Sequence, residues 1–193
     1  MLRLIRSLSR AVSLVLAVLA GLTMAAIFGI IFVNSLQRYL FGTSFQWGEK
    51  LPIYLTIYGV MFGTALGYLQ DRHVRFTVIT DLIPARVRHV LYLIVDLVMV
   101  AAGVMLAWSG WLFAESRGRV DASSIREAAR GLATTTGIDG LAIFGKLYPY
   151  QLALAIGGAL VAVAALVKFA ERLLEPVGAE PQAGAEISEG MGF

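Results

Sequence analysis

The chain has 193 residues, of which 58% are hydrophobic and 15% are charged, and its mean hydropathy is +0.76. A soluble domain carries roughly 25% charged residues, so this composition excludes a water-soluble globule and leaves little room for a catalytic domain. The net charge of +3 arises from basic residues scattered along the chain rather than gathered in one stripe, which argues against a nucleic-acid partner. The absence of cysteine excludes disulfides, thiolate metal sites and cysteine nucleophiles.

Four apolar runs predict four membrane helices, because about 20 apolar residues cross a hydrocarbon core of about 30 Å. They cover about residues 11–33, 51–69, 90–113 and 149–167. The first run exceeds the roughly 7 to 15 residues of a signal-peptide core, so we expect it to be retained; cleavage near Ala25 or Ala26 is the alternative. The runs are continuous, with Pro52 and Pro149 only at their edges, which favours helices over a membrane barrel.

The predicted fold is therefore all-α, an integral membrane protein that contacts the lipid bilayer along four helices. The membrane domain is expected over residues 1–175. Residues 176–193 are rich in Gly, Ala, Pro and Glu and are expected to be a disordered tail.

Two connections are expected to form helices of their own. Between the second and third spans, Phe76, Ile79 and Ile83 follow a helical spacing and precede Pro84, which predicts a short amphipathic helix over 75–83 in the membrane interface. A strand is the alternative, but a lone strand edge in lipid leaves backbone groups unpaired. The loop 114–148 contains Ser124 and Glu127 at the spacing of a capping box, which predicts a short external helix.

Orientation follows the basic residues near the helix ends. With the N-terminus inside, nine basic residues lie on the cytoplasmic side and seven on the outer side, together the 16 of the chain. We therefore expect both termini in the cytoplasm, and the connections 38–50 and 114–148 outside.

Little in the sequence points to catalysis. His73 and His89 flank the same connection, so they cannot hold a haem between opposite levels of the membrane, and no phosphate-binding loop or hydrolase motif occurs. We expect no cofactor in this chain and no enzymatic activity.

Asp96 is the single charge within the third apolar run. An unpaired charge there would cost roughly 2.5 to 3.5 kcal/mol, so its carboxylate must be paired, protonated or near water. We expect a structural hydrogen bond, within the chain or to a partner, and Asp96→Asn to retain most activity. The alternative is a self-assembling channel or small exporter that uses Asp96 as its coupling site.

Small residues recur at four-residue spacing along the predicted helices, which allows close helix contact. These ridges comprise Ala17, Gly21, Ala25 and Gly29; Gly59, Gly63 and Gly67; Gly103 and Ala107; and Ala153, Ala155, Gly157 and Ala159. They either close the four-helix bundle or, in part, face a second membrane protein.

Three segments carry a family resemblance. Residues 34–41 read N-S-L-Q-R-Y-L-F, residues 47–51 read W-G-E-K-L, and residues 73–86 read H-V-R-F-T-V-I-T-D-L-I-P-A-R. In this order the chain resembles the small membrane subunit, the DctQ-like or Q component, of tripartite ATP-independent periplasmic (TRAP) transporters. It departs from that family's pattern at Lys50, Thr77 and Ile83, where Glu, Asp and Leu are common.

The resemblance implies a non-catalytic inner-membrane subunit beside a much larger multi-span subunit, which carries the substrate and sodium sites. A periplasmic binding protein would deliver organic acids such as sialic acid or C4-dicarboxylates. The motif residues that become structural or docking candidates are Asn34, Arg38, Trp47, Glu49, His73, Arg75, Asp81 and Pro84.

We make specific predictions for two features of the face expected to lie outside the cell membrane. Arg38 and Glu49 are expected to form an ion pair that fixes the outer connection, with Trp47 at headgroup depth; independent solvated charges are the alternative. Arg126 and Arg130 are expected to help dock the binding protein, unless their helix merely covers the end of the bundle with Ile125, Ala128 and Leu132 packed downward.

Overall fold

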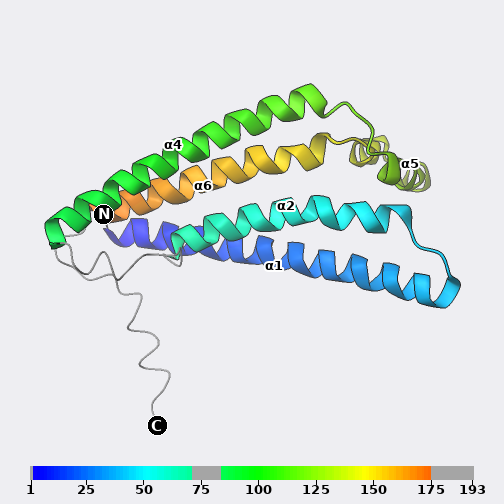
Figure 1. Ribbon diagram of the computed structural model, residues 1–193, viewed down its shortest axis with the longest axis horizontal. Helices are drawn as coiled ribbons and strands as arrows, with labels where there is room; N and C mark the ends of the chain where they lie inside the picture. The colour runs from blue at the N-terminus through cyan, green and yellow to red at the C-terminus, as the bar shows by residue number, and fades with distance from the viewer. Residues whose placement is uncertain (1, 71–83, 175–193) are drawn as a thin grey trace, which may run out of the picture.

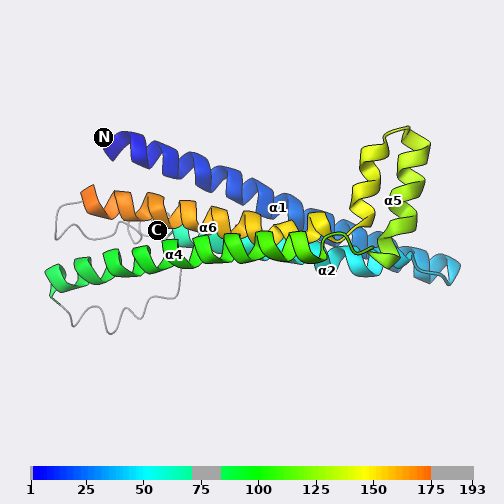
Figure 2. The same cartoon turned by 90° about the horizontal axis from the view of Figure 1, so that it is seen from above.

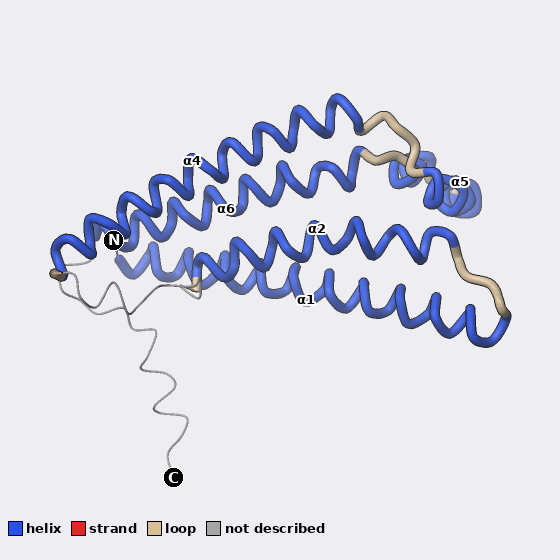
Figure 3. The backbone as a smooth tube through the Cα atoms, viewed as in Figure 1, coloured by secondary structure: helices blue, strands red, loops and turns tan. Residues whose placement is uncertain are grey.

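The computed structural model describes residues 2–70 and 84–174, which are helical except for short connections (Figures 1 and 3). The elements in chain order are α1 (Leu2–Phe41), α2 (Gln46–Leu69), α4 (Ala85–Arg117), α5 (Ser123–Thr136), the 3₁₀ helix η1 (Asp139–Gly145) and α6 (Tyr148–Leu174). Of these, α1, α2, α4 and α6 are long and apolar enough to cross a membrane. The all-α prediction with four membrane helices is confirmed.

The long helices extend beyond the apolar runs that predicted them. The first run ends at Val33, but α1 continues to Phe41. Gly42 follows with a φ of 71°, a conformation that ends a helix and that glycine adopts without strain. Hydropathy thus marks the membrane-embedded part of a helix, whereas the backbone continues to the residue that stops it.

The four long helices form an open row rather than a closed bundle (Figure 1). Helix α2 packs against α1 and α6, α6 packs against α4 along its length, and α1 makes a smaller contact with α6. Within the described residues α1 and α4 do not pack extensively on each other, so they form the two edges of the row. The buried core lies toward the end that holds the N-terminus, where Leu16, Phe62, Tyr68 and Val161 meet.

Glycines permit the close approach of α4 and α6. A Cβ atom at Gly103 would lie 2.6 Å from the Ala162 backbone nitrogen, and one at Gly110 would lie 2.5 Å from that of Ala155. From the other helix, a Cβ at Gly158 would lie 2.4 Å from the Ala107 nitrogen. Backbone atoms cannot move aside as a flexible side chain does, so this pair of small-residue ridges closes the α4–α6 contact.

The ridges of α1 and α2 are used differently. Gly59 faces Thr23 and Met24 of α1, but an added Cβ at Gly21, Gly29, Gly63 or Gly67 would meet nothing within 4 Å. Of the two alternatives, closure of the bundle therefore explains the ridges of α4 and α6 but not most of the ridge of α1.

Helix α5 and η1 form a hairpin that projects sideways from the row, at the end where α1 finishes and α6 begins (Figure 2). The segment that leads into α5 is joined to the segment that follows η1 by backbone hydrogen bonds. The Ala122 N–H donates to the Gly145 carbonyl (2.9 Å), and the Leu147 N–H donates to the Val120 carbonyl (2.9 Å). These bonds fix the base of the hairpin against the membrane helices.

Two predicted features lie outside the described residues. They are the interfacial helix over 75–83, with His73, Arg75 and Asp81, and the tail over 176–193. Pro84 is described and occupies the position just before α4.

Candidate functional sites

A buried ion pair joins two of the long helices near the end that holds the N-terminus. Arg172 Nη1 on α6 donates to Asp96 Oδ1 on α4 at 2.6 Å, and the Tyr68 hydroxyl on α2 donates to the same oxygen. Asp96 is 0% exposed. The guanidinium also lies over the Tyr92 ring, 5.1 Å from its centroid, as in a cation–π contact. Asp96 therefore connects α2, α4 and α6 through one carboxylate.

A second pair continues this polar cluster along α6. Lys168 Nζ lies 3.0 Å from Glu171 Oε2, and both side chains are mostly buried. Such pairs satisfy charges that would be costly alone in an apolar setting. The structural hydrogen bond expected for Asp96 is present within the chain, and its partners make it a joint between helices.

At the opposite end of the row, Asn34 fixes the turn between α1 and α2. Its Oδ1 accepts a hydrogen bond from the Phe45 N–H at 2.8 Å. A Cβ at Gly48 would lie 2.7 Å from Asn34 Cγ, so glycine is needed where this side chain crosses to α2. Asn34 therefore fixes the short connection that an ion pair between Arg38 and Glu49 was expected to fix.

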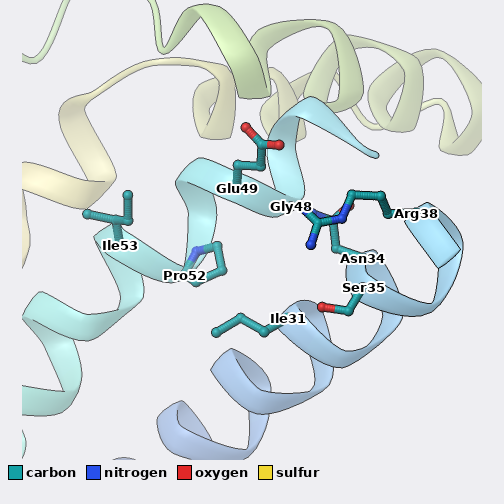
Figure 4. A pocket seen from close by; sticks show the side chains of 8 residues that line it. All are labelled: Ile31, Asn34, Ser35, Arg38, Gly48, Glu49, Pro52 and Ile53. Atoms are coloured by element: carbon teal, nitrogen blue, oxygen red, sulfur yellow. The ribbon is translucent and has the colours of Figure 1, made fainter. Parts of the chain in front are cut away.

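The expected ion pair between Arg38 and Glu49 does not form. Within residues 2–70 and 84–174 no salt bridge joins the two side chains; the Ser44 hydroxyl instead donates to Glu49 Oε1 at 3.1 Å. Figure 4 shows the Arg38 side chain extending toward Gly48 while the Glu49 carboxylate points away from it. The ion-pair prediction is wrong because both residues line one pocket but the Glu49 carboxylate is turned away from Arg38 (Figure 4).

Trp47 links this turn to the α5–η1 hairpin. Its ring stacks on Phe45 at 5.3 Å between centroids and packs against buried Ile125 and Tyr150. The Tyr150 hydroxyl donates to the Phe144 carbonyl at 2.8 Å, which ties η1 to α6. The hairpin is therefore anchored by aromatic contacts at its base.

Helix α5 differs from its prediction at its start. It begins at Ser123, with Ala122 as its N-cap and no capping side chain, so the predicted capping box is wrong. The tertiary hydrogen bond from Ala122 to Gly145 fixes where the helix starts. At the other end the helix continues to Thr136, where the Thr135 and Thr136 hydroxyls donate to carbonyls one turn earlier, and Gly137 ends it with a φ of 71°.

The buried face of α5 also differs in part. Ile125, Ala129 and Ala133 are buried, whereas Ala128 and Leu132 are exposed, against the expectation that these two pack downward. Arg126 Nη1 forms a salt bridge to Asp121 Oδ2 at 2.9 Å, while Arg130 is exposed. Arg126 and Arg130, which were both expected to help dock the binding protein, therefore differ in their contacts.

Sequence reasoning missed several residues that join helices. Arg172 lies just beyond the fourth apolar run and Tyr68 lies within the second, and neither was a candidate, yet both bind Asp96. Tyr58, whose hydroxyl donates to the Pro149 carbonyl, was also overlooked. The available signal was that each lies on the same helix face as small core residues, since Tyr68 follows Ala65 and Arg172 follows Ala165 at helical spacing.

These contacts define a small α-helical membrane protein of the multi-pass class, whose polar side chains hold helices and turns together. Residues 27–175 match the family model described as "Tripartite ATP-independent periplasmic transporters, DctQ component". The chain belongs to this family, and is a small membrane subunit of a TRAP transporter. It is thus a transport component and not an enzyme.

Two curated proteins illustrate the relationship. The chain is 25% identical over 107 residues to the "Putative TRAP transporter small permease protein" of Haemophilus influenzae (strain ATCC 51907 / DSM 11121 / KW20 / Rd), covering 55% of this chain and 66% of that protein. It is 33% identical over 70 residues to the "Sialic acid TRAP transporter permease protein SiaT" of Haemophilus influenzae (strain 86-028NP), covering 36% of this chain and 11% of that protein.

Proposed function

We propose that this chain is the scaffold subunit of a sodium-driven TRAP transporter for organic acids in the bacterial inner membrane, with both termini in the cytoplasm. The large subunit would bind substrate and sodium, and this chain would supply fixed helices beside it. The observation that carries the proposal is the unequal use of small-residue ridges: α4 and α6 close theirs on each other, while that of α1 is open. The sialic acid transporter among the relatives supports the organic-acid assignment.

The open ridge lies on the side of α1 turned away from the rest of the chain. Leu16 marks the buried side, where it is 1% exposed. Ala25 lies nine residues later, and at about 100° per residue nine steps place it on the opposite side of the helix. Only 6% of the apolar window of α1 is buried, against 50% for α6. We therefore assign this face to a helix of the large subunit.

Bulky substitutions on this face test the assignment. In the variant Gly21→Leu/Ala25→Leu, the chain is expected to stay folded, because Gly21 has no neighbour within 4 Å. Co-purification with the large subunit in mild detergent is expected to fall about tenfold, since extra methylenes in a packed contact cost about 1–3 kcal/mol and about 1.4 kcal/mol is a tenfold change in affinity.

Ala101→Leu, at an exposed position on α4, is the matched control and should leave co-purification unchanged. If Ala101→Leu separated the subunits and the α1 variant did not, the partner would lie on the other edge of the row. Purification as a homo-oligomer that transports alone would instead support the channel or exporter hypothesis.

We assign the outer face, including the α5–η1 hairpin, to transient contact with the substrate-binding protein. Arg130 is its most suitable contact, because it is exposed and no ion pair holds it among the described residues, whereas Arg126 is bound to Asp121. Charges at the rim of a docking surface mainly affect the rate and specificity of encounter.

Arg130→Glu is expected to lower uptake several-fold at limiting binding protein, with recovery at high concentration, because the encounter rate is reduced. Uptake measured in proteoliposomes over a range of binding-protein and salt concentrations checks this. Co-purification with the large subunit should stay normal.

Glu127→Gln, on the same helix and also exposed, is the control. Uptake unaffected by Arg130→Glu at every salt concentration would exclude the docking role. A cysteine at exposed Ser123 in this cysteine-free chain should react with an impermeant maleimide from the periplasm, and failure to do so would contradict the orientation.

A further inference from the structure

A pocket of about 390 Å³ lies between α1 and α2 at the outer end of the row (Figure 4). It is lined by Ile31, Asn34, Ser35, Arg38, Gly48, Glu49, Pro52 and Ile53. Neither the ion pair nor the docking surface described above uses this pocket. Its walls combine an exposed cation, an exposed anion and small polar groups.

The two charges of the pocket are not neutralised by each other. Among the described residues Arg38 has no hydrogen-bonding or salt-bridge partner, and Glu49 accepts a bond from the neutral Ser44 hydroxyl. The guanidinium offers five N–H donors in a planar fork, and Ser35 adds a hydroxyl nearby. This part of the pocket suits a phosphate group, and Glu49, which also lines the pocket, supplies a carboxylate that suits an ammonium group.

The depth of the pocket points to a lipid headgroup. The uncharged run 11–33 is about 35 Å long as a helix, close to the thickness of a hydrocarbon core. Asn34 follows it directly, and Arg38 lies one turn beyond. The pocket therefore lies where the apolar part of α1 ends, at the level of phospholipid headgroups.

An apolar surface leads from the pocket toward the membrane core. Ile31 precedes Asn34 by one turn on α1, and Ile53 follows Glu49 by one turn on α2; both are exposed. Acyl chains of a lipid bound at Arg38 could lie against these side chains. A charged side chain of a partner protein would leave this apolar surface unused.

We propose that this pocket binds the headgroup of a zwitterionic phospholipid that carries a primary amine, with its phosphate on Arg38 and its ammonium group on Glu49. The lipid fills the gap between α1 and α2 beside the turn that Asn34 holds. This inference depends only on the described α1–α2 hairpin and not on the face assigned to the large subunit.

Native mass spectrometry of the full chain, purified with its large subunit, tests the proposal with three lipids of identical acyl chains. Phosphatidylethanolamine is expected to bind about tenfold more tightly than phosphatidylglycerol, which lacks the amine, because one charge-assisted hydrogen bond is lost. Phosphatidylcholine, whose quaternary ammonium has no N–H to donate, should also bind about tenfold more weakly.

The variants separate the two halves of the site. Arg38→Gln should weaken all three lipids about tenfold, whereas Glu49→Gln should remove only the preference for phosphatidylethanolamine. Lys50→Gln, exposed and adjacent to Glu49 but outside the pocket, is the matched control and should change nothing.

Three outcomes would overturn the proposal. Equal binding of phosphatidylethanolamine and phosphatidylglycerol would remove the zwitterionic specificity. Full competition by inorganic phosphate would identify a free-anion site. If Arg38→Gln reduced co-purification of the large subunit without altering lipid binding, a side chain of that subunit would occupy the pocket.

Discussion

Replacing Asp96 with leucine is expected to destabilise the subunit by about 3–5 kcal/mol, because it leaves the Arg172 guanidinium without its carboxylate in the interior of the chain. Asp96→Asn should be milder, since an amide oxygen can still accept hydrogen bonds from Arg172 and Tyr68. The double variant Asp96→Leu/Arg172→Met should recover most of the loss, because it removes both charges. Thermal stability in detergent, followed by fluorescence-detected size exclusion, measures all three.

Glu115→Leu provides the control, since it removes an exposed acid from the same helix. If the double variant were as unstable as Asp96→Leu, the two side chains would act independently rather than as a pair. Transport distinguishes the remaining role of Asp96: Asp96→Asn should retain most activity, and a variant that assembles normally but does not transport would show that the carboxylate takes part in coupling.

Gly158→Ala is expected to destabilise the α4–α6 contact by about 1–3 kcal/mol, and Gly158→Leu by more. The added Cβ would lie 2.4 Å from the Ala107 nitrogen and 2.8 Å from the Gly103 carbonyl oxygen, and both are backbone atoms of α4. The two helices must therefore separate along their length. The stability of the isolated subunit, measured by thermal unfolding, checks this expectation.

Gly63→Ala is the matched control, because a Cβ there would meet nothing within 4 Å. It makes the same chemical change in a membrane helix and should alter stability by less than about 1 kcal/mol. Equal destabilisation by the two variants would mean that the loss reflects glycine itself and not the helix contact. The α1 variant Gly21→Leu/Ala25→Leu should behave like Gly63→Ala in the isolated subunit and lose only its partner.

Local sequence patterns were sufficient to predict the membrane class, the four spans and a helix in the loop 114–148. Each of these depends on composition or on neighbours within a few residues: the apolar runs give the spans, and helical spacing in the loop 114–148 gives α5. The motifs around Asn34, Trp47 and Pro84 also indicated the family, which the match over residues 27–175 confirmed.

Which residues contact each other across helices depends on long-range packing. Arg172 lies 76 residues from Asp96, and no local pattern specifies that this arginine enters the core instead of remaining at the membrane surface. In the same way, Arg38 and Glu49 flank a short turn, yet the packing of Gly48 against Asn34 sets their side chains apart. The open row has the same origin, since equal small-residue ridges occur on several helices and only their mutual orientation determines which become buried. The spacing of small and apolar residues determines which face of a helix can be buried, whereas long-range packing determines which helix lies against that face.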